Sequence, residues 1–152
     1  MILIVETTAG ETAGETVDGE AVDPAPSFRT DPEQLLAFLS FGAAERYGSL
    51  HPLSGVVNLL RRRHDVDTRP LLSFGDAVPG DEEDERELER LWQEPGPLAE
   101  AAAGAAAAIR TNERLSSLAR DFPRLPDLLD DLAAIARWAA DRGARIRLTY
   151  RL

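Results

Sequence analysis

A helical pattern dominates residues 98–143 of the 152-residue chain and leaves it few choices of architecture. Residues 98–120 contain a tract of seven alanines interrupted once by Gly104, and alanine has the highest intrinsic helix propensity. In residues 125–139, leucine, isoleucine and alanine recur at steps of three and four, which predicts a second helix that closes at Gly143. Because small alanine side chains let two helix axes approach closely, we expect an antiparallel helical hairpin.

The two ends of the chain have the patterns of β-strands. Residues 145–152 alternate strictly between polar and apolar side chains, which is typical of a strand with one buried face. The apolar run from Ile2 to Val5 predicts a short buried strand. The N-terminal segment is acidic and the C-terminal strand is basic, so we expect the two to pair in one sheet, in an orientation that the sequence does not fix.

The segment that follows the first strand predicts a hairpin and two helices. The Asp18-Gly19 pair within residues 16–22 favours a type I′ β-hairpin. A capping box at residues 30–33 indicates the start of a helix that we expect to reach Gly48. Apolar spacing then predicts a shorter helix over residues 53–64.

Residues 81–93 have the pattern of an acidic surface helix, whereas residues 66–74 fit either an edge strand or a loop because Pro70 interrupts them. Together the patterns predict a single helix-rich α+β domain over residues 1–152. In it, about five helices cover a small sheet built from the N-terminal strand and hairpin and the C-terminal strand. Its expected parts are a strand and hairpin region at 1–30, two helices and a connection at 31–75, helices at 81–142 and a strand at 145–152.

The basic residues are unusual, because all 17 are arginine and the sequence contains neither lysine nor cysteine. The absence of lysine excludes a lysine Schiff base and a Walker-type phosphate loop. The absence of cysteine excludes thiolate nucleophiles, disulfides and cysteine-ligated metal centres. An arginine-only composition rich in alanine and leucine is typical of a GC-rich genome. The ten prolines also fit a thermophilic source, a hypothesis that a melting temperature would test.

The net charge of −10 opposes binding to nucleic acid and to anionic membranes. The five apolar residues at the start are too few for a membrane span and lack the basic flank of a signal peptide, so we expect a cytoplasmic protein. The charge is unevenly distributed, with a net charge of −8 in residues 76–100 and +3 in residues 101–152. We expect any recognition surface to lie in one of these two segments.

The acidic candidate site is a run of five carboxylates at the start of the third predicted helix, namely Asp81, Glu82, Glu83, Asp84 and Glu85. It could dock a basic partner, or it could simply match the positive end of the helix dipole. A calcium loop would need ligands at alternate positions around a turn glycine, and here Gly80 precedes the run.

Two groups of arginines are candidate anion-binding sites. Arg145, Arg147 and Arg151 share one face of the last predicted strand, where they could hold a phosphate or carboxylate. The alternative is a solvent-facing strand whose charges prevent edge-to-edge pairing. The second group, Arg61, Arg62 and Arg63, lies near the expected end of a helix, where the helix dipole favours positive charge in any case.

The two histidines, His51 and His64, are thirteen positions apart, which matches no known metal-ligand spacing. No Gly-x-Ser-x-Gly elbow accompanies them. The sequence therefore identifies no catalytic residue, metal ligand or cofactor.

The leading hypothesis is a non-catalytic acidic module that binds another protein, or itself as a homodimer, in an adaptor or antitoxin-like role. It depends on charge segregation and on the absence of a recognisable catalytic pattern. The alternative is a small enzyme or ligand-binding protein that acts on an anionic small molecule through arginine, histidine and carboxylate residues. That alternative requires these side chains to meet in one cavity.

Overall fold

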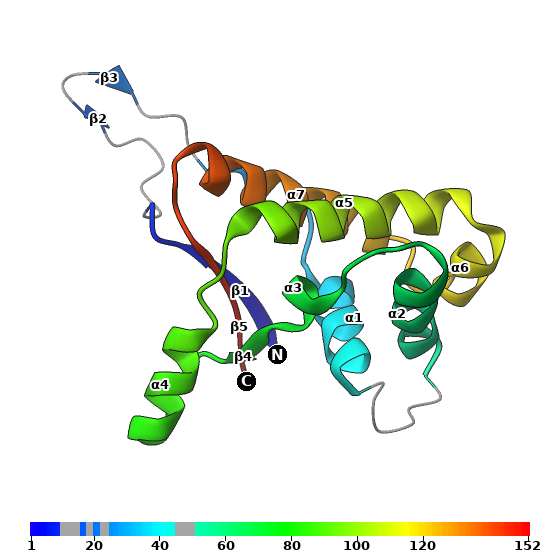
Figure 1. Ribbon diagram of the computed structural model, residues 1–152, viewed down its shortest axis with the longest axis horizontal. Helices are drawn as coiled ribbons and strands as arrows, with labels where there is room; N and C mark the ends of the chain where they lie inside the picture. The colour runs from blue at the N-terminus through cyan, green and yellow to red at the C-terminus, as the bar shows by residue number, and fades with distance from the viewer. Residues whose placement is uncertain (10–15, 18–19, 22–24, 45–50) are drawn as a thin grey trace.

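The computed structural model describes residues 1–9, 16–17, 20–21, 25–44 and 51–152. Within these ranges the chain forms seven helices and five strands (Figure 1). The helices are α1 (Glu33–Ala44), α2 (Pro52–Arg63), α3 (Arg69–Leu72), α4 (Glu82–Arg90), α5 (Pro95–Thr111), α6 (Glu113–Leu118) and α7 (Leu125–Asp141). The strands are β1 (Ile2–Thr7), β2 (Thr16–Val17), β3 (Glu20–Ala21), β4 (Phe74–Asp76) and β5 (Ile146–Arg151). The helix-rich α+β class predicted from the sequence is confirmed.

The main sheet has three strands in the order β1-β5-β4. β1 pairs with β5 in antiparallel orientation, with Ile2 opposite Arg151 and Thr7 opposite Ile146. The predicted pairing of the two chain ends is therefore confirmed, and its direction is now fixed. β4 pairs with the other side of β5 in parallel orientation, so the C-terminal strand is the centre of the sheet. The alternative in which it was an exposed edge strand is wrong.

The third strand of the sheet comes from the segment that the sequence left ambiguous. Pro70 lies in the first turn of α3, where a missing N–H costs nothing because that N–H has no partner in a helix. The chain leaves this short helix at Ser73 and enters β4 at once. Proline in this segment therefore marks a helix start, and the strand begins only after it.

The predicted hairpin pairs as expected, with Thr16 opposite Ala21 and Val17 opposite Glu20. It forms a separate two-stranded sheet and does not extend the main sheet. The Asp18-Gly19 turn lies outside the described residues, as does the predicted continuation of the first helix beyond Ala44 to Gly48.

The helical hairpin consists of α5 and α7, which run antiparallel side by side along one side of the molecule (Figure 1). The helix expected over residues 98–120 is divided in two at Asn112. The backbone of Asn112 is not helical, and its side-chain oxygen accepts a hydrogen bond from the N–H of Leu115 at 3.0 Å. Asn112 thus ends α5 and caps α6. Gly143, with φ +63°, follows α7 in the predicted left-handed conformation.

The hydrophobic core lies between the helical hairpin, α1, α2 and the inner face of the sheet. Ala102, Ala105 and Ala106 of α5 are fully buried, which is how the two long helices come close together. Leu128 and Leu132 of α7 are also fully buried. In the part of the chain that the structure describes, no helix is both long and apolar enough to cross a membrane.

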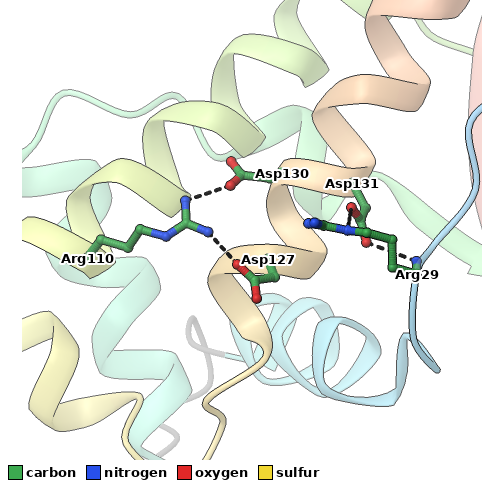
Figure 2. A network of polar contacts seen from close by, with 5 residues as sticks. All are labelled: Arg29, Arg110, Asp127, Asp130 and Asp131. Carbon is green, nitrogen blue, oxygen red and sulfur yellow. Dashed lines mark hydrogen bonds and ion pairs between the residues drawn. The ribbon is translucent and has the colours of Figure 1, made fainter.

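Arginines bind the acidic residues of α7 on two sides, as Figure 2 shows. Arg110 of α5 reaches Asp127 and Asp130 with one guanidinium nitrogen each, at 2.6 Å in both cases. Arg29 binds Asp131 through its backbone N–H at 3.1 Å and its Nε at 2.8 Å. These contacts join α5 and the segment before α1 to the same helix.

Candidate functional site

The acidic run predicted as a docking site lies at the start of α4, a helix whose nine residues are all described and none of which is buried. An isolated helix of this length is marginal in water, so local contacts must stabilise it. Asp81 is its N-cap and accepts a hydrogen bond from the N–H of Asp84 at 2.8 Å. The carboxylate of Asp84 in turn accepts one from the N–H of Gly80 at 3.0 Å. Two of the five predicted carboxylates therefore also cap the helix.

The C-terminal end of α4 is attached to the outer face of the sheet by Arg147 of β5. The guanidinium of Arg147 lies 4.3 Å from the ring centre of Trp92 and donates a hydrogen bond to the carbonyl of Leu88 at 3.3 Å. It also forms an ion pair with Glu6 of β1 at 2.8 Å. Gly75 allows Leu91 to approach β4, since a Cβ at that glycine would lie 3.1 Å from a Leu91 methyl group. One end of α4 is thus fixed while the other projects (Figure 1).

The projecting part of α4 has little internal compensation for its negative charge. Within the described residues, its ion pairs are limited to Arg86 with Glu82, which stand 4.0 Å apart with both side chains largely exposed. Exposed pairs of this kind contribute little to stability. The acidic residues lie at the end of the helix where the dipole favours anions, which offsets part of their charge. The projecting part of α4 is still an exposed surface of net negative charge.

A hollow of about 330 Å³ lies beside this surface, between α4 and β4. Its lining combines apolar residues, a glycine and three carboxylates. The lining residues are Phe74, Gly75, Asp76, Val78, Asp84, Glu87 and Leu91. Of these, only Asp84 was identified from the sequence. Asp76 and Glu87 fall in the same acidic segment, but no sequence pattern indicated that a short parallel strand would bring them together.

The three arginines of the last strand do not form one open anion-binding surface. Arg147 is only 11% exposed and is bound to Glu6, while Arg145 and Arg151 are exposed toward the two ends of β5. Thr149, expected on the same solvated face, is fully buried. The reason is that the end of α4 covers the face of the sheet that the alternation suggested was open. Anion binding by Arg145 and Arg151 stays a prediction.

The second arginine group is exposed at the C-terminal end of α2. Arg61, Arg62 and Arg63 lie in the last turn, where they face the negative end of the helix dipole. Figure 1 places this end of α2 away from β5, so the two arginine groups do not converge. Their proposed binding role stays a prediction.

The histidines lie at opposite ends of α2, which at a rise of about 1.5 Å per residue separates them by about 20 Å. His51 caps the N-terminus, where its Nδ1 accepts a hydrogen bond from the N–H of Leu53 at 3.1 Å, and its ring stacks on Phe41 at 3.5 Å. His64 caps the C-terminus. Among the described residues, no group of three or more histidines and acids is placed to hold a metal ion.

A second hollow, of about 280 Å³, lies near His64 and is lined by acidic residues of the loop after α2 and of α5. Asp67 in this loop binds the side chain of Arg69 at 2.9 and 2.7 Å. These hydrogen bonds, with one from the backbone N–H of Arg69, lower the pKa of Asp67 from 3.8 to about 2. The carboxylate therefore has its cationic partner within the chain.

In comparisons with known proteins, no family model matches this chain, and no curated protein and no solved structure matches it either.

Proposed function

We propose that the protein is an interaction module that binds a basic segment of another protein through α4 and the adjoining hollow. The observation that supports this most directly is the position of α4. It is a helix without a buried residue, and its acidic end projects from the sheet. A helix of this kind adds no buried side chain to the core, so we infer that its charged surface serves binding.

The hollow indicates the kind of partner side chain. Phe74 and Leu91 in its lining suit the apolar stem of an arginine or lysine, whose charged end would meet Asp84 or Glu87. Its volume of about 330 Å³ is at the small end of the roughly 300–1,000 Å³ usual for ligand pockets. We therefore favour a single inserted side chain, with further basic residues along α4.

The attachment by Arg147 also favours binding. Association costs free energy when a surface must become ordered, and a surface that is already held reduces that cost. Arg147 contacts Trp92, the Leu88 carbonyl and Glu6 together, so the base of α4 is fixed before a partner arrives. A role as an adaptor or antitoxin and a cytoplasmic location stay predictions.

The alternative, an enzyme or binding protein for a small anion, needs arginine and histidine side chains that meet in one cavity. In the described ranges, the candidate arginines and histidines lie at the ends of α2 and along β5. No observation favours this alternative over protein binding.

The experiment measures binding of a hexa-arginine peptide to the full chain by titration calorimetry. The test variant neutralises the three carboxylates of the hollow, as Asp76→Asn, Asp84→Asn and Glu87→Gln. We expect it to weaken binding about tenfold or more, because charge-assisted contacts to a shaped site are lost. Asparagine retains an acceptor oxygen for the turns at positions 76 and 84, and circular dichroism checks that the helices remain.

A matched control neutralises three exposed acids outside α4, as Glu94→Gln, Glu100→Gln and Glu113→Gln. Its net charge equals that of the test variant, so it measures the non-specific attraction of a polycation to an acidic protein. We expect a loss of about threefold or less in the control. Equal losses in both variants, or no binding to the unaltered chain, would contradict the proposal.

A further inference from the structure

The exposed apolar side chains of the described residues gather at one end of the main sheet. The large ones are Met1 at 70%, Ile2 at 62%, Val78 at 56% and Leu152 at 85% exposure. They lie at the same end of the sheet because β1 begins where β5 ends, and β4 ends at the same level. Figure 1 shows the N- and C-termini side by side at this end. Three of the four, all except Val78, lie on β1 or next to its start.

β1 is an edge strand, with β5 on one side only. The N–H of Thr8 donates to the carbonyl of Arg145 at 3.0 Å. In an antiparallel pair, the N–H and C=O groups of successive residues point alternately toward and away from the neighbouring strand. Since Thr8 bonds toward β5, the backbone groups of Leu3, Val5 and Thr7 point away from it. Within the described part of the chain, no backbone hydrogen bond reaches these outward groups. A row of unused donors and acceptors therefore runs along the outer edge of β1.

Among the described residues, this edge lacks the side-chain features that usually prevent pairing with another strand. Natural edges are shielded by lysine, proline, inward-pointing charges or bulges. The side chains of the first five residues of the chain are all uncharged and apolar. The one charged residue of β1 is Glu6, whose carboxylate is already bound by Arg147.

We propose that β1 pairs in antiparallel orientation with β1 of a second copy of this chain, about a two-fold axis at Leu3. The outward N–H of each Leu3 then donates a hydrogen bond to the outward C=O of Leu3 in the other copy. Met1 of each copy faces Val5 of the other, and Ile2 faces Ile4. Glu6 falls outside the paired segment, so no like charges oppose each other. The two sheets join into one of six strands, in the order β4-β5-β1-β1-β5-β4.

Two features favour a second copy as the occupant. The paired segment is apolar throughout, so it is complementary to itself when reversed. A largely apolar hollow of about 300 Å³ also lies beside the start of β1, with Met1, Leu36, Phe41 and the acid Glu33 in its lining, and can receive a side chain from the other copy. Elsewhere each copy has a net charge of −10, so the uncharged strand is the surface where repulsion is least. This inference does not depend on binding by α4.

The experiment is sedimentation equilibrium on the full chain. We expect a monomer–dimer equilibrium, and the Ile2→Lys variant should raise the dimer dissociation constant about tenfold or more, since edge lysines oppose strand pairing. Val78→Lys is the matched control. Val78 is exposed at the same end of the sheet but follows β4, two strands from the proposed contact. We expect this control to leave the dissociation constant unchanged.

A second pair of variants tests the register. Val5→Pro removes an outward N–H inside the proposed paired segment, and Thr7→Pro removes one just beyond it. Only Val5→Pro should abolish the dimer, with circular dichroism confirming that both variants fold. In the unaltered dimer, the amides of Leu3 and Val5 should exchange more slowly than in the Ile2→Lys monomer.

Four results would overturn the proposal, of which the last concerns salt. The first is a chain that stays monomeric at every soluble concentration, and the second is a dimer weakened by Val78→Lys but not by Ile2→Lys. The third is open-ended assembly in place of a closed dimer. Raising the salt from about 0.1 M to about 1 M shortens the screening length from about 10 Å to about 3 Å. It should therefore strengthen the dimer, and weakening by salt would equally contradict pairing through an uncharged edge.

Discussion

Two acidic helices of this protein, α7 and α4, use their carboxylates in opposite ways. On α7, Asp127 and Asp130 bind Arg110, and Asp131 binds Arg29 (Figure 2). The rest of that helix is largely buried, with nine buried residues in all. On α4 no residue is buried, and the contact of Glu82 with Arg86 is at the 4.0 Å limit of an ion pair.

The difference teaches that the number of acidic residues does not identify a binding surface. What separates the two helices is whether an arginine elsewhere in the chain reaches each carboxylate. Three carboxylates of α7, those of Asp127, Asp130 and Asp131, are bound by arginines 17 to 102 positions away in the sequence. The carboxylates of α4 have mainly local contacts, in its N-terminal cap. A basic partner would therefore find uncompensated negative charge on α4, whereas on α7 three carboxylates are already bound by Arg110 and Arg29.

The largest expected difference in the free energy of unfolding comes from replacing one leucine of each helix by alanine. Leu132→Ala on α7 removes a fully buried side chain and should lower the free energy of unfolding by about 2–5 kcal/mol. Leu88→Ala on α4 removes a half-buried one and should cost about 1 kcal/mol or less. Urea denaturation measures both. Losses of similar size would show that α4 belongs to the cooperative core.

A smaller effect is expected from removing the arginine that attaches α4. Arg147→Met loses the stacking on Trp92 and leaves Glu6 without its ion-pair partner. It should lower the free energy of unfolding by about 1–3 kcal/mol. Amide exchange over α4 should rise more than exchange over α7.

The matched control is Arg142→Met, because Arg142 lies 4.1 Å from the ring centre of Trp138 at the end of α7 but is exposed. An exposed arginine–tryptophan contact contributes about 0.5–1 kcal/mol. If the two substitutions cost the same, the ion pair to Glu6 contributes nothing measurable and α4 is held by its apolar contacts alone.

The sequence predicted those parts of the fold that depend on local pattern. Alanine content and leucine spacing located α5 and α7, and strict alternation located β5. The break at Asn112 had a visible signal, because asparagine is among the preferred N-cap residues. It was outweighed by the alanine tract before it, which made one long helix the simpler interpretation.

The parts that could not be predicted depend on contacts between distant residues. Arg147 and Glu6 are 141 positions apart, and neither residue type indicates such a pairing. β4 has only three residues, too few for a periodic pattern to be recognised. Its position beside β5 made the C-terminal strand central and created the hollow under α4. The acidic run of the candidate site was therefore visible in the sequence, but its shape was not.

The smallest predicted effect concerns Asp67. Its carboxylate is exposed, like the carboxylates of α4, but it is bound by an arginine, like those of α7 that Arg110 and Arg29 bind. Hydrogen bonds from Arg69 lower its pKa from 3.8 to about 2. A carboxyl whose pKa is lowered by folding stabilises the protein fully above the higher value. That contribution is lost as the pH falls through about 2. Because the pair is exposed, the effect belongs in the titration of Asp67 more than in global stability.

Arg69→Met should therefore raise the pKa of Asp67 toward 3.8, as followed by carboxyl carbon shifts in NMR. The rise should be incomplete, because the backbone N–H of residue 69 still donates to Asp67 at 3.1 Å. Arg86→Met, which alters the exposed pair on α4, should leave the pKa of Asp67 unchanged. A pKa that stays near 2 in Arg69→Met would mean that the backbone N–H, not the guanidinium, holds the charge of Asp67. Exposed arginines would then be poor guides to which carboxylates of this chain are compensated.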